Sequence, residues 1–270
     1  MLRRRLIDMG DERLFWRSDV DVGGWIAPRL GPFDGRVCTV VPRGFEAYVR
    51  ILHPVSNDQD PDGPDYYTWA QVCAFTGRRP HALMQWRAIS GGWADGREPI
   101  PIDHPWPGEN PEIGFLTAES LAALCAVLAR FTRPDAECFF ALWEGYGWIH
   151  GSPAVVALGP GGWSATVPPA FPREIMDGPR LRHPHRDYIL FSGPLSAAGS
   201  LHVPGPWEQT PNIIWPEDQS WCVASEIDFD STVAAGSREL VDALLAAPGL
   251  EVWEVGPDDS LAFDGDRVNT

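Results

Sequence analysis

Two stretches of the chain carry apolar side chains at the spacing of an amphipathic helix. In residues 117–132 and 237–247, apolar residues recur at positions i, i+3, i+4 and i+7, namely Leu121, Leu124, Cys125 and Leu128 in the first and Leu240, Val241, Leu244 and Leu245 in the second. An N-cap threonine or serine precedes each stripe, and a proline follows it. A third helix is expected to begin at Thr68, to break near Gly77 and to restart at Pro80.

Segments rich in β-branched and aromatic residues lie between turn signals and predict strands. They span residues 37–41, 45–54, 139–148, 155–158, 188–191 and 221–229, with strand-like runs also at 137–143 and 250–255. Strands and helices do not alternate regularly, which argues against a doubly wound parallel sheet. We therefore expect an α+β fold with a mixed, mostly antiparallel sheet and three or more helices packed on it.

The stretch of residues 159–184 is rich in glycine and proline, and we expect a boundary there. The sequence predicts a single α+β domain over residues 1–270. Within that domain, the Gly/Pro-rich stretch would join two lobes, residues 1–158 and 185–270.

Composition limits the chemistry open to this chain. Its formal net charge is −16, and all 21 basic residues are arginine. Because no lysine is present, mechanisms that need an ε-amine are excluded, among them Schiff-base catalysis and the phosphate-loop NTPases. An acidic chain with scattered arginines is also a poor nucleic-acid binder. A basic protein or a cationic ligand fits this charge better, and no cofactor is expected.

The sequence predicts a soluble, cytoplasmic protein. Acidic residues follow the short basic start at once, and no apolar run reaches the roughly 20 residues of a membrane span, so neither a secretion signal nor a membrane association is expected. The five cysteines are odd in number, widely spaced and set in apolar segments, which is typical of buried thiols in a reducing compartment.

Two motifs have some of the spacing of a metal site. Asp58, Asp60 and Asp62 form the first half of a calcium loop, but Trp69 stands where that loop needs a bidentate glutamate. His183, His185 and Asp187 form a His-x-His-x-Asp string that resembles the metal-binding start of the metallo-β-lactamase family, but Tyr188 replaces the next histidine. We therefore favour a solvated acidic loop and a loop that leads into a strand, and predict no metal.

Acidic and aromatic residues are combined in two further segments. Glu226, Asp228 and Asp230 would share one face of a strand, because strand side chains alternate. Glu144 is flanked by aromatic residues, and a partly buried carboxyl of this kind would have a raised pKa. The simplest interpretation is a solvated strand face and a turn. The functional interpretation is a surface for a cationic ligand, whose aromatic and acidic binding residues would be Trp143, Trp148, Trp215 and Asp218.

Two functions follow from these candidates. The first is an acidic interaction protein that neutralises or regulates a basic protein partner, with no catalytic role. The alternative is a carboxylate-dependent hydrolase, with or without a divalent metal, in which Glu144, Glu226, Asp228 and Asp230 would take acid and base roles.

Longer strings carry a resemblance that spans most of the chain. The segments 140–148, 187–195, 211–218 and 221–232 resemble a recurrent group of uncharacterised proteins from high-GC actinobacteria. No activity is attached to that group. The resemblance therefore implies a GC-rich bacterial source for this tryptophan-rich chain, and a GC-rich genome also accounts for arginine in every basic position.

Overall fold

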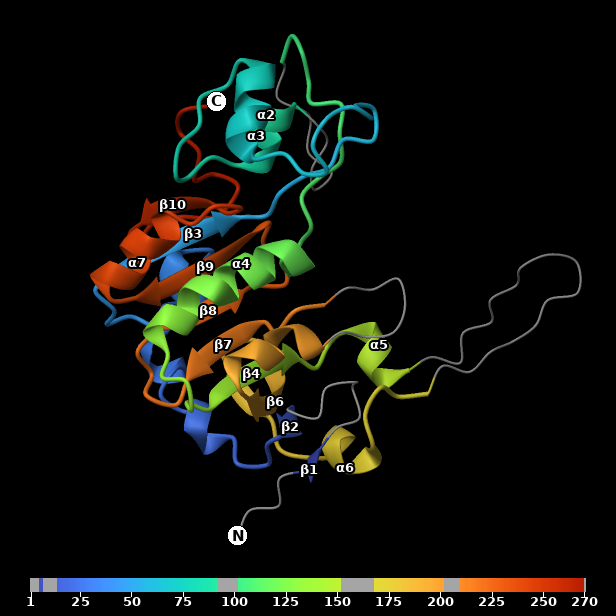
Figure 1. Ribbon diagram of the computed structural model, residues 1–270, viewed down its shortest axis with the longest axis vertical. Coiled ribbons are helices and arrows are strands. Elements are labelled where there is room, and N and C mark those ends of the chain that lie inside the picture. The colour runs from blue at the N-terminus through green and yellow to red at the C-terminus, as the bar shows by residue number, and fades with distance from the viewer. Residues whose placement is uncertain (1–4, 7–13, 92–101, 152–167, 202–208, 270) are drawn as a thin grey trace, which may run out of the picture.

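One antiparallel sheet forms the centre of the molecule (Figure 1). The computed structural model describes residues 5–6, 14–91, 102–151, 168–201 and 209–269. The strands are β1 Arg5–Leu6, β2 Phe15–Trp16, β3 Ala47–Leu52, β4 Cys138–Trp143, β5 Leu181–His183, β6 Arg186–Gly193, β7 Ile213–Pro216, β8 Cys222–Ser225, β9 Ser231–Gly236 and β10 Glu251–Val255. Their order is β1-β2-β6-β4-β7-β8-β9-β3-β10, and β5 pairs with β6 beside this path. Every pairing among the described strands is antiparallel, so the predicted α+β fold is confirmed.

Short helices and 3-10 turns surround this sheet. The α-helices are α1 Val37–Val40, α2 Trp69–Thr76, α3 Trp86–Ser90, α4 Ala118–Leu128, α5 Gly147–His150, α6 Arg173–Met176 and α7 Arg238–Leu245. The 3-10 helices are η1 Asp21–Gly23, η2 Ala27–Arg29, η3 Ala129–Phe131 and η4 Leu195–Ser200.

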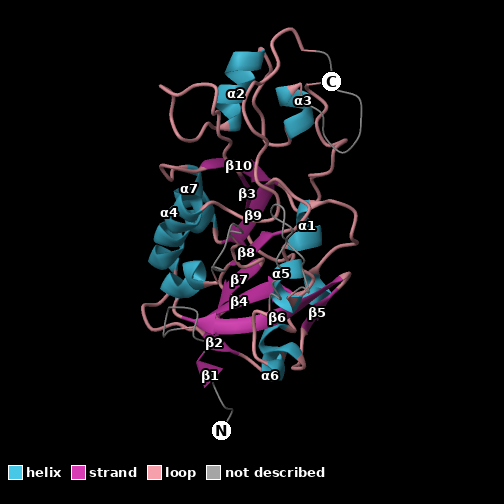
Figure 2. Cartoon of the chain, turned by 90° about the vertical axis from the view of Figure 1, so that its right-hand side faces the viewer, coloured by secondary structure: helices cyan, strands magenta, loops and turns pink. Residues whose placement is uncertain are grey.

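The two faces of the sheet bury different layers (Figure 2). Helices α4 and α7 cover one face, where Leu124 and Leu244 join alternate strand residues such as Phe140 in a single buried cluster. The segment 20–41, which includes α1, covers the other face and packs on residues such as Trp215. Side chains alternate along each strand, so neighbouring residues point to opposite faces of the sheet. Because a layer covers each face, the central strands are buried on both sides.

The predicted helix starts are confirmed at three positions. Thr68, Thr117 and Ser237 each accept a hydrogen bond from the backbone N–H three residues on, which satisfies a donor that the first turn leaves unpaired. Helix α2 also ends as expected, because Gly77 takes the left-handed conformation at φ 72°. The restart at Pro80 is wrong, since the next helix begins only at Trp86.

Three predicted strands differ from the structure. Residues 37–40 form helix α1, whose first turn is stabilised by a hydrogen bond from the Arg36 N–H to the Thr39 hydroxyl. The strand expected over 139–148 ends at Trp143, and the one expected over 221–229 ends at Ser225. The strand expected at 155–158 lies outside the described residues.

Helices α2 and α3 pack above the β3 and β10 edge of the sheet (Figure 1). The carboxylate of Glu251 in β10 accepts hydrogen bonds from the backbone N–H groups of Trp69 and Ala70 at the start of α2. The buried guanidinium of Arg50 in β3 donates to the carbonyl oxygens of Ala82 and Met84. These contacts fix the position of the loops that leave the α2 and α3 region.

Strands from both expected lobes join the same sheet. Strand β4 pairs with β6 and β7, and β3 pairs with β9 and β10. The described part of the Gly/Pro-rich segment contains α6 and β5. The lobe boundary itself stays a prediction.

The described residues contain no helix that is both long and apolar enough to cross a membrane. All five cysteines are free thiols; four are buried and Cys125 is partly buried. Burial raises the pKa of the Cys73, Cys125 and Cys138 thiols to about 12. These thiols are therefore poor nucleophiles.

Candidate functional site

The three carboxylates expected on one strand face do not lie on a strand. Strand β8 ends at Ser225, and residues 226–230 form the connection to β9, closed by a hydrogen bond from the Phe229 N–H to the Glu226 carbonyl oxygen. The prediction of an aligned carboxylate row is therefore wrong. The prediction assumed that side chains alternate between two faces along a strand, and this alternation does not hold in a turn.

Each of these carboxylates is paired with an arginine of the same chain. Arg186 Nη2 lies 2.7 Å from Glu226 Oε1 and 2.9 Å from Asp228 Oδ2. Asp230 Oδ1 lies 3.2 Å from Nη2 of the buried Arg50. Glu144 follows the same rule, because its Oε2 lies 2.6 Å from Arg180 Nε. Charges expected to attract a cationic ligand are thus matched internally.

The expected aromatic residues separate into two groups. Trp143 and Trp148 both contact the ring of Tyr146, with centroid distances of 5.1 Å and 6.2 Å. Trp143 also lies 5.6 Å from the guanidinium carbon of Arg186, so it does join Glu226 and Asp228 in one cluster. Trp215, in contrast, is fully buried against Phe139 and has no surface for a ligand.

Asp218 lies apart from that cluster. It belongs to the β7–β8 turn, at the opposite end of the two strands from Glu226. Its Oδ1 accepts a hydrogen bond from the Ser220 N–H at 3.1 Å. The structure therefore gives Asp218 a turn-forming contact and does not bring it to Trp143.

The candidate metal ligands do not converge. In the β5–β6 hairpin, His183 pairs with Arg186 while Asp187 pairs with Arg182, which puts His183 and Asp187 on opposite faces. His185 lies in the turn and packs on Phe33. Within the described residues, no group of three or more His, Cys, Asp or Glu side chains could hold a metal ion.

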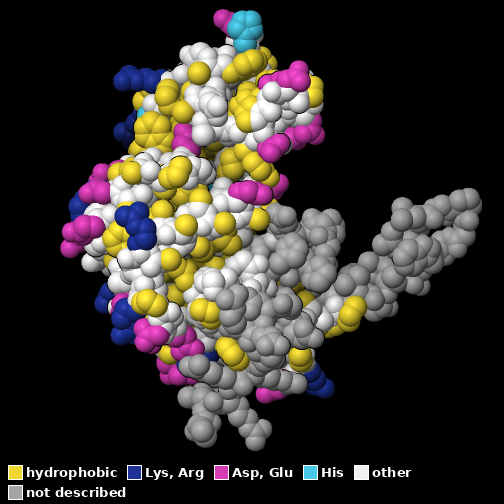
Figure 3. Space-filling view, in the orientation of Figure 1, with side chains coloured by type: hydrophobic (Ala, Val, Ile, Leu, Met, Phe, Trp, Pro, Cys, Tyr) yellow, Lys and Arg dark blue, Asp and Glu magenta, His cyan; other side chains and the backbone are white. Residues whose placement is uncertain are grey.

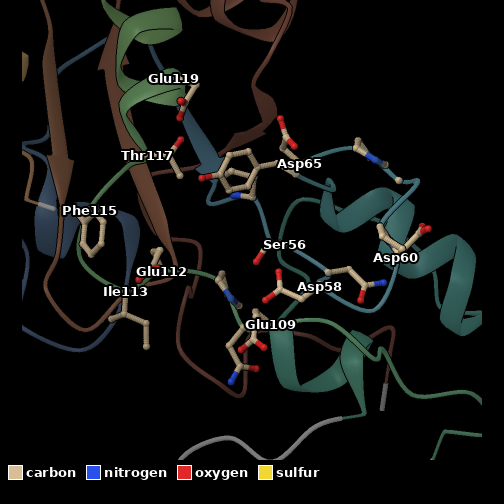
Figure 4. A pocket seen from close by; sticks show the side chains of 18 residues that line it. Ser56, Asp58, Asp60, Asp65, Glu109, Glu112, Ile113, Phe115, Thr117 and Glu119 are labelled. Carbon is tan, nitrogen blue, oxygen red and sulfur yellow. The ribbon is translucent and has the colours of Figure 1, made fainter. Parts of the chain in front are cut away.

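The acidic loop that begins at Asn57 takes part in a larger feature, a groove of about 1390 Å3. One wall is the loop of residues 54–66, and the other is the segment 109–119, which ends in the first turn of α4 (Figure 4). Six carboxylates line it: Asp58, Asp60, Asp65, Glu109, Glu112 and Glu119. We call this feature the acidic groove. Figure 3 shows acidic side chains on both sides of a hollow at the right of the molecule, below the α2 and α3 region.

Backbone contacts hold the two walls of the acidic groove at a fixed spacing. The Glu109 N–H donates to the Ser56 carbonyl oxygen at 2.9 Å, and Gln59 Nε2 donates to the Pro107 carbonyl oxygen at 2.9 Å. Beneath the groove, Nδ1 of the buried His53 lies 2.6 Å from the Glu112 carbonyl oxygen. Because an ordinary carbonyl oxygen only accepts, His53 carries its proton on Nδ1 and accepts from Thr232 at Nε2.

The acidic groove differs from the predicted cluster because its carboxylates have no counter-ion in the described part of the chain. No described arginine or histidine lines it. Among the described residues, none of its carboxylates forms an ion pair, and only Asp60 has a side-chain hydrogen bond, which it accepts from the Tyr67 hydroxyl. Ile113, which is 54% exposed, and Tyr66, which is 44% exposed, add apolar surface to the lining.

The sequence revealed only part of this groove. Asp58 and Asp60 were candidate ligands for calcium, whereas Asp65 and the three glutamates were not singled out. The available signal was the acidic character of two proline-containing segments, residues 57–65 and 109–119. These two segments come together only because α2 and α3, which lie between them in the sequence, pack in a particular way. No local sequence pattern predicts that packing.

Comparisons with known proteins add no relative to this description. Searches against protein-family models, curated proteins and solved structures each returned no match.

Proposed function

We propose that this protein binds a basic segment of a protein partner in the acidic groove. The observation that carries the proposal is a concave surface whose described lining has six carboxylates, no cationic side chain and no ion pair. Such a surface attracts cations, and its field adds to that of a chain with a net charge of −16. Binding of this kind would neutralise or regulate the partner.

The size and lining of the groove favour a polypeptide over a small molecule. Pockets for drug-sized ligands occupy roughly 300–1,000 Å3, whereas the acidic groove measures about 1390 Å3. Exposed apolar groups such as Ile113 would contact the aliphatic stems or neighbouring residues of the bound segment.

The alternative function, a carboxylate-dependent hydrolase, has less geometric support. Its best-placed carboxylate is Glu226, whose pKa burial raises even though Arg186 opposes the shift. The cavity beside Glu226 measures only about 20 Å3, which leaves no room for a substrate.

Charge-removing variants test the groove directly. We expect the triple variant Asp58→Asn, Glu109→Gln, Glu112→Gln to bind an octa-arginine peptide about tenfold more weakly than the wild type, since an exposed ion pair contributes roughly 0.2–1 kcal/mol. Isothermal titration calorimetry would measure the affinity. The matched control is Asp135→Asn, Asp218→Asn, Glu239→Gln, which removes the same charge from exposed positions outside the groove.

The comparison of the two triple variants decides the proposal. A loss confined to the groove variant supports it. An equal loss in both variants would mean that the peptide responds to net charge alone, and the proposal would fail.

A further inference from the structure

The acidic groove contains an exposed apolar surface beside its carboxylates. Ile113 is 54% exposed and Phe115 is half-buried, and both line the groove from the wall of residues 109–119. Figure 4 shows these two side chains at one side of the groove, while Asp58 and Asp60 belong to the other wall. Single exposed apolar residues are common on protein surfaces, so the place and the fixation of Ile113 decide whether it can act in binding.

The backbone that carries Ile113 is fixed on both sides. Pro111 and Gly114 are buried, and the Gly114 N–H donates to the Phe229 carbonyl oxygen at 2.9 Å. Gly114 has a φ of 86°, and a Cβ atom at this position would lie 2.9 Å from the Ile227 Cα. The chain therefore packs against the turn between β8 and β9 at a distance that only glycine allows. These contacts hold the exposed side chain of Ile113 at one place in the groove.

The preceding residue places a carboxylate next to this apolar side chain. Glu112 is exposed, and its carbonyl oxygen accepts the hydrogen bond from Nδ1 of His53. An acidic and an apolar side chain thus project from adjacent residues whose backbone is bonded on both sides. A surface that is ordered before binding loses less conformational entropy when a partner binds. Such a surface suits a segment that carries a basic and an apolar residue close together.

A purely basic segment matches this surface less well. The aliphatic stem of an arginine can cover apolar surface, but its guanidinium stays hydrated or paired with a carboxylate. A residue of the size of leucine removes more of Ile113 and Phe115 from water, and apolar burial strengthens binding in proportion to the area removed.

We propose that the acidic groove selects a segment in which a large apolar residue accompanies the basic residues, and that Ile113 determines this specificity. The inference rests on the proposed function, because it concerns the partner bound in the same groove. Ile113 contacts the apolar residue of the segment, while Glu112 and the other carboxylates pair with its basic residues.

Two peptides of equal charge test this specificity. One alternates pairs of arginines with single leucines, and the other has serines in place of the leucines. We expect the wild type to bind the leucine peptide about tenfold more tightly than the serine peptide, because the leucines bury apolar surface. In the variant Ile113→Ser this preference should fall to about twofold, while the affinity for the serine peptide stays unchanged. Isothermal titration calorimetry measures both affinities.

The matched control is Val268→Ser, which should keep the full preference. Val268 is also β-branched, is 48% exposed and does not line the groove. Ile113→Ser changes an exposed side chain, so the fold should be retained. If that variant does not fold, Ile113→Thr keeps the β-branched shape and provides the same comparison.

The outcomes separate this inference from the proposed function. No leucine preference in the wild type, or an equal preference in Ile113→Ser, would overturn the inference. If the leucines add nothing but binding of the serine peptide still depends on Asp58, Glu109 and Glu112, the inference fails and the proposed function stands. If neither peptide depends on those three carboxylates, both fail.

Discussion

At the residue scale, the main feature is the use of arginine as an internal counter-ion. Glu144, Glu226 and Asp230 each face a guanidinium from a distant part of the chain. The sequence shows which carboxylates exist but not which arginine reaches them, because those partners come together only through sheet pairing. The carboxylates that the sequence offered for a cationic ligand are therefore neutralised by arginines of the same chain.

The Arg186–Glu226 pair predicts strong coupling in a double-mutant cycle. Removing one partner of a buried pair costs roughly 3–5 kcal/mol because the other charge stays buried. We expect Arg186→Met to lower the free energy of unfolding by about 3 kcal/mol, and Arg186→Met with Glu226→Gln to cost less than the sum of the single variants.

Denaturant unfolding of the four proteins measures this coupling. Arg238→Met is the control, because Arg238 and its partner Glu254 are about half exposed, and solvent screens such a pair so that it contributes little to stability. Strict additivity of the two changes at Arg186 and Glu226 would contradict the prediction.

Two histidines, His53 in the core and the partly buried His183, predict acid sensitivity. Burial lowers the pKa of His53 and His183 to about 4, whereas an unfolded histidine titrates near 6.5. The unfolded chain therefore binds more protons between these values, and stability is lost as the pH falls from about 6.5 toward 4. Each histidine accounts for roughly 2 kcal/mol by about pH 5.

The variant His183→Phe isolates one of these contributions. Its free energy of unfolding should fall less than that of the wild type between about pH 7 and pH 5. Glu226 and Glu251 act in the opposite sense, because burial raises their pKa and favours the protonated folded state as the pH falls. They are common to both proteins, so they leave the difference unchanged; identical pH profiles would refute the assignment to His183.

At the scale of elements, local rules predicted the helices better than the strands. Helix caps depend on residues three positions apart, and the starts at Thr68, Thr117 and Ser237 were therefore readable. Strand β9 was missed because Ser231–Gly236 is small and weakly apolar. Its strand state depends on pairing with β8 and β3, which no local pattern reports.

The caps of helix α2 give a test at this scale. Thr68→Ala removes the acceptor for the Gln71 N–H, and we expect a loss of about 1 kcal/mol in the free energy of unfolding. Gly77→Ala should cost a similar amount, roughly 1–2 kcal/mol, since the left-handed φ of 72° strains an alanine. Ala74→Gln, exposed on the same helix, is the control and should change stability by less than about 0.5 kcal/mol.

At the scale of the whole molecule, the fold class was predictable and the acidic groove was not. Irregular alternation of helices and strands was enough to favour an antiparallel α+β arrangement. The groove needs two acidic segments brought together across α2 and α3, and the acidity of each segment alone is equally typical of a solvated loop. Net charge was the only global property that indicated the class of partner.

That net charge predicts opposite effects of salt on stability and on binding. With a charge of −16, self-repulsion disfavours the compact state, and salt screens it. Raising the ionic strength from about 0.01 M to 0.15 M shortens the screening length from about 30 Å to 8 Å. We therefore expect the melting temperature to rise while the affinity for octa-arginine falls.

The groove variant separates these two effects. Removing charge at Asp58, Glu109 and Glu112 should raise the low-salt melting temperature at least as much as removing it at the three control positions, because both changes remove three negative charges and the groove carboxylates repel one another at closer range. Only the groove variant should flatten the salt dependence of peptide binding, because only there are the carboxylates concentrated in one concave surface. If the two variants show the same salt dependence of binding, the attraction belongs to the whole surface of the molecule and the acidic groove has no particular part in it.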